Sequence, residues 1–131
     1  MMIARWTIDA RFGRKQAALA LMRQWWSDIA PRIGWSRDRA RLLTGSLGAA
    51  ESTIQVEVEI ADLAQLDDAW AKLASVPEQE TWAAALEPLV VSGTATWSVY
   101  RLVPAGGAPG DAQPGIARVP LRPVDDRESR A

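Results

Sequence analysis

The stretch TIQVEVEI at residues 53–60 decides the fold, because apolar and polar side chains alternate along it without a break. A period of two is typical of a strand that buries one face. The small-residue stretch GAAES at 48–52 precedes it, and residues 37–47 are predicted to form a less regular strand. Strands joined by so short a turn are antiparallel neighbours, so the two strands are predicted to form a hairpin.

The amino-terminal part predicts a strand followed by a helix. Residues 2–10 alternate, with Ala4, Trp6 and Ile8 on one side. From residue 15 to about residue 30, the apolar residues take the spacing of one helix face. These apolar residues are Ala18, Leu21, Met22, Trp25 and Ile29. Pro31 and Gly34 are expected to end the helix.

The part after the hairpin predicts two helices and a last strand. Asp62 and Gln65 have the spacing of a capping box, which predicts a helix start. An apolar stripe follows, made of Leu63, Leu66, Trp70 and Leu73. Pro77 suits the first turn of a second short helix, in which Trp82 and Leu86 face inward. Residues 94–102 alternate again and are predicted to form the last strand.

The order βαββαβ predicts an α+β fold of the ferredoxin-like type. Right-handed crossovers place the helices on one face of a four-stranded antiparallel sheet, with the first and third strands in its centre. We expect this domain to span residues 1–103. Residues 104–131 are rich in Pro and Gly, which predicts a tail or an arm without packed elements.

The composition limits the chemistry. The 131 residues contain no Cys, His or Asn. Disulfides, cysteine nucleophiles, thiolate metal sites and the usual histidine base are therefore excluded. The sequence also has no phosphate-binding or metal-binding motif, so we expect neither a cofactor nor a metal.

The net charge of -1 gives no reason to expect a nucleic-acid partner. Arg37, Arg39 and Arg41 imitate a basic patch, but Asp38 interrupts them, which favours a solvated start of a strand. The sequence shows neither the apolar core of a signal peptide nor an apolar run of ~20 residues. We therefore expect a cytoplasmic protein without a membrane partner.

The helix-free face of the predicted sheet gathers polar side chains from several strands. The candidate catalytic residues are Glu57, Glu59 and Tyr100, and the candidate substrate-binding residues are Arg5, Thr7 and Ser98. Two carboxyl groups on one face can raise the proton affinity of one of them, and an arginine can hold a carboxylate through two bonds. We expect this face to form the only concavity of the fold. A solvated sheet face and a plain Arg5–Glu57 ion pair stay open as alternatives.

The seven tryptophans invite a ligand-cage hypothesis. Trp6, Trp25, Trp70 and Trp97 fall on predicted core faces, where packing is the favoured role. Trp26 and Trp35 are left over, and either is a candidate to cover a subunit edge or a pocket.

A family resemblance lies in the second half of the core. The residues that carry it are the stretch 57–60, Leu63, Trp70, the turn 76–78, Trp82 and the stretches 88–93 and 100–103. They resemble bacterial members of the dimeric α/β-barrel superfamily, closest to NIPSNAP-like domains. The resemblance implies a homodimer whose sheets pair to close a barrel. Oxygenases of the antibiotic-biosynthesis type use an Asn, Trp and His set, and haem-binding relatives use a His ligand, so the absence of Asn and His disfavours both activities.

Two functions stay open on this basis. The first is a small-molecule-binding dimeric α/β-barrel protein, which includes a cofactor-free enzyme acting on an aromatic or polyketide-like metabolite. The alternative is a non-catalytic dimeric interaction or regulatory module. The polar sheet face favours the first, and the absence of His, Cys and Asn favours the second.

Overall fold

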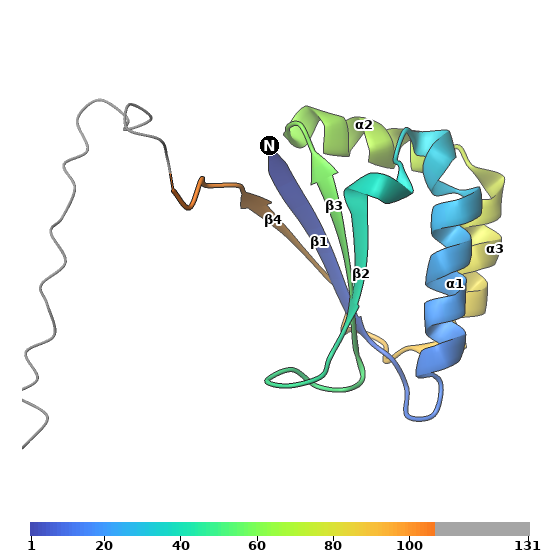
Figure 1. The fold of residues 1–131 in the computed structure, drawn as a ribbon. Helices are drawn as coiled ribbons and strands as arrows, with labels where there is room; N and C mark the ends of the chain where they lie inside the picture. Colours follow the sequence, from blue (N-terminus) through green and yellow to red (C-terminus); the bar gives the residue numbers. More distant parts are fainter. Residues whose placement is uncertain (107–131) are drawn as a thin grey trace, which may run out of the picture.

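Four antiparallel strands form the sheet of the computed structural model, which describes residues 1–106 (Figure 1). β1 (Met2–Asp9) and β3 (Thr53–Ile60) are central, with β2 (Ala40–Thr44) beside β3 and β4 (Thr96–Arg101) beside β1. This order, β2-β3-β1-β4, confirms the predicted ferredoxin-like α+β fold.

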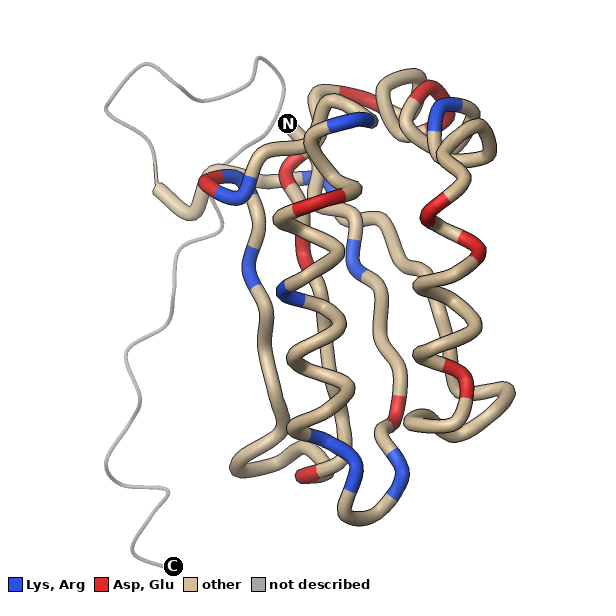
Figure 2. Tube along the Cα trace, turned by 90° about the vertical axis from the view of Figure 1, so that its right-hand side faces the viewer, with Lys and Arg blue, Asp and Glu red and all other residues tan. Residues whose placement is uncertain are grey.

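The helices lie on one side of this sheet. α1 (Lys15–Asp28) and α3 (Pro77–Leu86) stand side by side in both views, and α2 (Leu63–Leu73) lies across one end of the sheet (Figures 1 and 2). Short 3₁₀ turns connect these elements, namely η1 (Ala30–Ile33), η2 (Arg37–Arg39) and η3 (Glu87–Leu89). The opposite face of the sheet carries no helix in the described part of the chain.

The start of α2 follows the predicted capping pattern. The Asp62 side chain accepts a hydrogen bond from the backbone N–H of Gln65 at 2.9 Å. The Gln65 side chain in turn accepts from the backbone N–H of Ala61 at 2.6 Å, one residue earlier than in a standard capping box. The first contact satisfies a backbone donor that the first turn leaves free, and the second satisfies the N–H of the residue before the cap.

The end of α1 differs from the prediction. The α-helix stops at Asp28, and η1 continues the chain through Pro31 to Ile33. Pro31 does not terminate the segment, because the first turn of a helix needs no N–H from it. Gly34 ends it with φ +82°, a left-handed conformation that suits glycine. The predicted strand 37–47 is also shorter, because η2 occupies its first residues.

The register places polar and apolar side chains on opposite faces. Arg5 pairs with Glu57 on β3 and with Ser98 on β4, and the preceding residue, Ala4, pairs with Val58. Directly paired residues point to the same face of a sheet. Ala4 and Val58 are buried toward the helices, so Arg5, Glu57 and Ser98 lie on the helix-free face, as predicted.

Two apolar clusters fill the space between the sheet and the helices. One contains Trp26, Trp35 and Val58, and the other contains Met22 and Ile54. Val56 packs against both clusters. The interior is therefore divided into two clusters that meet at Val56.

The predicted tail at 104–131 falls almost entirely on residues 107–131, which lie outside the described residues. The domain boundary after residue 103 therefore stays a prediction. None of the helices in the described part of the chain has the length and the apolar character that a membrane crossing requires.

Candidate functional site

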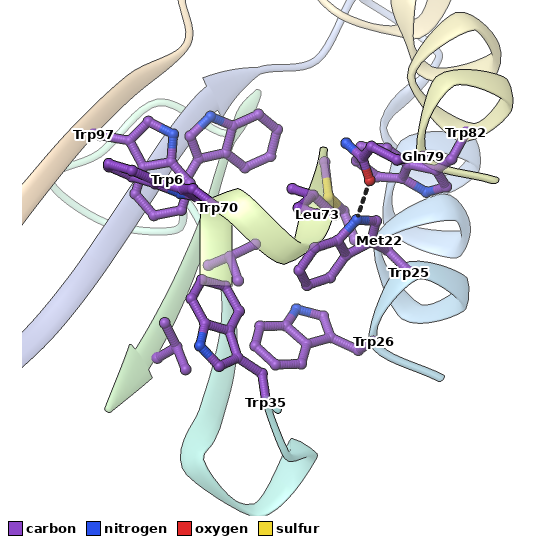
Figure 3. A pocket seen from close by; sticks show the side chains of 12 residues that line it. Trp6, Met22, Trp25, Trp26, Trp35, Trp70, Leu73, Gln79, Trp82 and Trp97 are labelled. Carbon is purple, nitrogen blue, oxygen red and sulfur yellow. Dashed lines mark hydrogen bonds between the residues drawn. The ribbon is translucent and has the colours of Figure 1, made fainter. Parts of the chain in front are cut away.

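All seven tryptophans line one pocket between the sheet and the helices (Figure 3). The pocket has a volume of about 340 Å³. Its other lining residues are Met22, Val56, Val58, Leu73 and Gln79. This volume lies within the range of small-molecule sites.

The outer wall of the pocket consists of three indoles from three elements. Trp6 on β1 and Trp97 on β4 are register partners, with ring centroids 6.5 Å apart. Trp70 on α2 meets the Trp97 ring edge-on at 5.6 Å. Trp70 and Trp97 are 40% and 45% exposed, so this wall reaches the surface.

The inner wall consists of the other four indoles. Trp26 on α1 stacks on Trp35 at 5.9 Å with an interplanar angle of 19°, and both are 6% exposed. Trp25 contacts Trp26 at 5.2 Å and Trp82 at 6.2 Å, which connects α1 to α3. Such tilted and edge-on contacts add stability beyond the burial of the rings.

Local structure explains how these rings come together. Trp25 and Trp26 are adjacent on α1, so they point in directions about 100° apart and widen the inner face of the helix. The turn at Gly34 sets Trp35 beside them, and the Trp35 backbone N–H donates to the Ala30 carbonyl at 3.0 Å. The Trp82 indole Nε1 donates to the Leu21 carbonyl at 2.7 Å and is thereby fixed between α3 and α1.

The pocket contains little polarity and no charge. Among the described residues that line it, none carries an ionisable side chain, and Gln79 is the only amide. The Trp25 indole donates to Gln79 Oε1 at 2.7 Å. An apolar lining with one oriented polar group suits a neutral aromatic molecule, because a buried unpaired charge would be costly.

Gln79 is held by the first turn of α3. Its neighbour Glu78 forms an ion pair with Arg32 of η1 at the surface. A hydrogen bond from its own backbone N–H and the Arg32 guanidinium lower the pKa of the Glu78 carboxyl from its usual value. A negative charge at this position also suits the positive end of the helix.

The predicted site residues on the helix-free face form a second group. Glu57 Oε1 accepts from Arg5 Nε at 2.8 Å, and Glu57 Oε2 accepts from Arg41 Nη2 at 2.8 Å. The Arg5 guanidinium carbon lies 4.8 Å from the centre of the Tyr100 ring, within reach of a cation–π interaction. The structure thus brings Arg5, Glu57 and Tyr100 together.

The remaining predicted site residues are less closely associated. Ser98 lies opposite Arg5 in the register, and Thr7 lies between Gln55 and Thr96. Glu59 is exposed and forms no ion pair within residues 1–106. Whether any of these residues takes part in binding or catalysis stays a prediction.

One expectation from the sequence is wrong. The helix-free face is not the only concavity, because the tryptophan pocket lies on the other side of the sheet. Trp6 and Trp25 pack against the core clusters, as predicted, and line the pocket together with Trp70 and Trp97. Trp26 and Trp35, the two leftover residues, are the most deeply buried tryptophans, and both line the pocket.

The sequence contained a signal for this pocket in its tryptophan content, which reaches seven in 131 residues. The pattern of each strand and helix places its tryptophans on a core face one by one, which does not indicate that all seven rings meet at one pocket. In the described part of the chain, no three side chains of His, Cys, Asp or Glu come together in a way that could hold a metal ion.

Comparisons with known proteins show the fold. No family model matches the chain, and no curated protein matches it. Among solved structures, an uncharacterized NIPSNAP-like domain protein from Burkholderia xenovorans aligns with a TM-score of 0.67 and 13% identity, over 82% of this chain and 89% of that one. Protein Atu4242 from Agrobacterium tumefaciens aligns with a TM-score of 0.65 and 14% identity, over 79% and 94%.

SnoaB, a cofactor-independent oxygenase from Streptomyces nogalater, aligns with a TM-score of 0.57 and 14% identity, over 77% of this chain and 91% of that one. These alignments confirm the predicted resemblance in fold to NIPSNAP-like proteins, and a cofactor-independent oxygenase shares that fold. At such low sequence identity these alignments show a shared fold only, so a function has to be argued from the residues of the site.

Proposed function

We propose that the protein binds a flat, uncharged aromatic small molecule in the tryptophan pocket. The observation that carries this proposal is the convergence of all seven indoles on one 340 Å³ pocket. An interior closed for stability alone would be filled, since protein cores pack without voids of this size. Trp70 and Trp97 at the exposed wall provide the entrance.

The seven indoles also provide the readout. A bicyclic aromatic such as naphthalene is expected to change the tryptophan emission in a saturable way. Trp70→Ala removes a ring from the exposed wall and should weaken binding about tenfold, or ~1.4 kcal/mol. Phe12→Ala is the matched control, because Phe12 is a fully exposed aromatic residue outside the pocket.

Either of two results would contradict the proposal. One is an emission that stays constant up to the solubility limit of each aromatic compound tried. The other is an equal loss of affinity in Trp70→Ala and Phe12→Ala, which would mean that binding does not depend on the pocket.

The pocket lining favours binding over acid–base catalysis. None of its described residues has an ionisable side chain, and the candidate catalytic residues Glu57, Glu59 and Tyr100 lie on the other face of the sheet. A cofactor-free enzyme on the same ligand is the second candidate function, favoured by the shared fold with a cofactor-independent oxygenase. Incubation of the bound compound with the protein in air, followed by chromatography, separates the two, because only an enzyme consumes the compound.

We also propose that two copies pair through their helix-free faces. This face is open in the single chain, and it exposes Leu43 and Tyr100 beside polar groups. The edges of β2 and β4 are also unpaired, and symmetric pairing would cover them.

Sedimentation tests the dimer and should give about twice 14.3 kDa. Leu43→Asp should yield monomers, whereas Leu63→Asp on α2 should not. A wild-type monomer at micromolar concentration would contradict the dimer and leave the pocket proposal standing.

The helix-free face offers the alternative function, a non-catalytic dimeric interaction module. The same face also holds the predicted second site around Arg5 and Glu57. Arg5 and Glu57 lie outside the pocket lining. Variants of these two residues therefore test functions of the helix-free face without changing the pocket.

A further inference from the structure

The polar atoms of the pocket are almost all hydrogen-bond donors. An indole N–H donates and cannot accept, and seven of the lining residues are tryptophans. The lining side chains provide one strong acceptor, the Gln79 carbonyl oxygen, and one weak acceptor, the Met22 sulfur. Whether the Gln79 oxygen is free or already hydrogen-bonded therefore determines whether the pocket can accept a hydrogen bond from a ligand.

The Gln79 oxygen is already engaged. Trp25 Nε1 donates to Gln79 Oε1 at 2.7 Å. Since the indole can only donate, the amide atom that faces it must be the oxygen, which fixes the orientation of the amide. The amide nitrogen with its two N–H groups is therefore turned away from Trp25 (Figure 3), and it belongs to a residue that lines the pocket.

A second donor in the lining also lacks a partner. The Trp35 Nε1 atom is buried and makes no hydrogen bond to any described residue. Trp82 Nε1, in contrast, is satisfied by the Leu21 carbonyl. A buried donor without a partner is costly, but this atom is closed to solvent, so the accessible donors of Gln79 are the ones that a ligand can meet.

We propose that the pocket selects its ligand by hydrogen-bond polarity. It takes aromatic molecules that carry a carbonyl or ring-ether oxygen and no donor, in preference to molecules of the same shape that lack the acceptor or present a hydroxyl or amine donor. Gln79 is the specificity-determining residue, and its amide N–H groups donate to the ligand oxygen. This inference rests on the proposed function, because it assumes that an aromatic ligand occupies the pocket.

A hydrogen bond to the ligand contributes little net free energy, but a buried polar group that is left without a partner costs more. A site built to hydrogen-bond a ligand atom rejects the analogue that lacks that atom, because the buried partner is left unsatisfied. A ligand donor would meet further donors, the weakly accepting Met22 sulfur and the Gln79 oxygen, which already accepts one hydrogen bond from Trp25. A carboxylate is disfavoured as well, because no positively charged side chain is found among the described lining residues.

Coumarin and naphthalene test this proposal, since both consist of two fused six-membered rings and only coumarin carries acceptor oxygens. Their affinities are compared by equilibrium dialysis, which does not depend on indole emission. Because naphthalene is more hydrophobic, the informative quantity is the change in the affinity ratio between wild type and variant.

Gln79→Met keeps the length of the side chain and removes both donors. It should weaken coumarin about fivefold and leave naphthalene unchanged. Gln79→Glu keeps an oxygen for Trp25 and also removes the donors, so it should shift preference from coumarin to 2-naphthol, whose hydroxyl can donate to the carboxylate. Gln24→Met is the matched control, because Gln24 is exposed on α1 outside this pocket.

The outcomes distinguish the polarity inference from the proposed function. Equal weakening of coumarin and naphthalene in Gln79→Met, or coumarin binding that neither Gln79 variant changes, overturns the polarity inference and leaves the proposed function intact. Failure of both probes to bind the wild-type protein overturns the proposed function and the inference together.

Discussion

Arg5 and Glu57 face each other across β1 and β3, and Arg5 Nε donates to Glu57 Oε1 at 2.8 Å. The other carboxylate oxygen accepts from Arg41 on β2. Glu57 is only 4% exposed although it lies on the helix-free face. Its carboxylate therefore connects three neighbouring strands through both of its oxygens.

This arrangement predicts that Glu57→Gln destabilises the fold by about 2 kcal/mol, because two guanidinium groups lose their anionic partner. Arg5→Met should cost a similar amount, and Arg41→Met about 0.5 kcal/mol or less, since the Arg41 side chain is 68% exposed. Urea unfolding of the single and double variants should show coupling between Arg5 and Glu57.

The same variants test the predicted second site. A purely structural pair leaves ligand binding unchanged, whereas a binding role for Arg5 or Glu57 lowers the affinity for a ligand on the helix-free face with little change in stability. The affinity for a pocket ligand should stay the same in either case, because neither residue lines the pocket. Strictly additive stability effects would rule out the structural pair.

The two walls of the pocket predict different effects of tryptophan removal. Trp26 is buried among other rings, so Trp26→Ala should lower the free energy of unfolding by roughly 3–5 kcal/mol. Trp70 is 40% exposed, so Trp70→Ala should cost about 1 kcal/mol while it weakens ligand binding. Denaturant titrations would measure both, and equal costs would mean that burial does not determine how much each tryptophan contributes to stability.

The alternating strands, the apolar helix faces and the capping residues of α2 predicted the element order βαββαβ, and the handedness of the crossovers then predicted the sheet order and the helix layer. Each of these patterns depends on neighbours along the chain, which a sequence displays directly. The continuation of the chain after α1 was not predictable in the same way, because Pro31 is compatible both with ending a helix and with starting a 3₁₀ turn.

The tryptophan pocket shows the limit of such reasoning. Side-chain periodicity shows that Trp6 and Trp97 face the helices, but it does not show how far apart the sheet and α1 lie. Whether seven large rings close a core or surround a cavity depends on that spacing. The Arg5–Glu57 pair was easier to foresee, because strand register alone brings the two residues together.

The capping contact at Asp62 predicts a measurable local contribution. Asp62→Ala removes the acceptor for the Gln65 backbone N–H and should cost about 1 kcal/mol. Asp67→Ala on the same helix is the control, because Asp67 is exposed and forms no ion pair within residues 1–106. Thermal unfolding should therefore distinguish the two alanine variants, and an equal effect would mean that the cap contributes nothing specific.

Truncation after Val103 tests the predicted boundary between domain and tail. Every helix and strand of the described residues ends by Arg101, and the last backbone contact joins the Leu102 N–H to the Met1 carbonyl at 3.1 Å. The shortened chain should therefore keep its thermal midpoint within about 2 °C, since it loses none of these contacts.

Sedimentation of the truncated chain provides the second readout. The dimer should persist if the two sheets pair through their helix-free faces, because that surface lies within residues 1–103. Loss of the dimer with an unchanged thermal midpoint would identify the segment around Val119 and Leu121 as an arm exchanged between copies. A large drop in the thermal midpoint would instead show that residues 104–131 contribute to the core, and the boundary after residue 103 would be wrong.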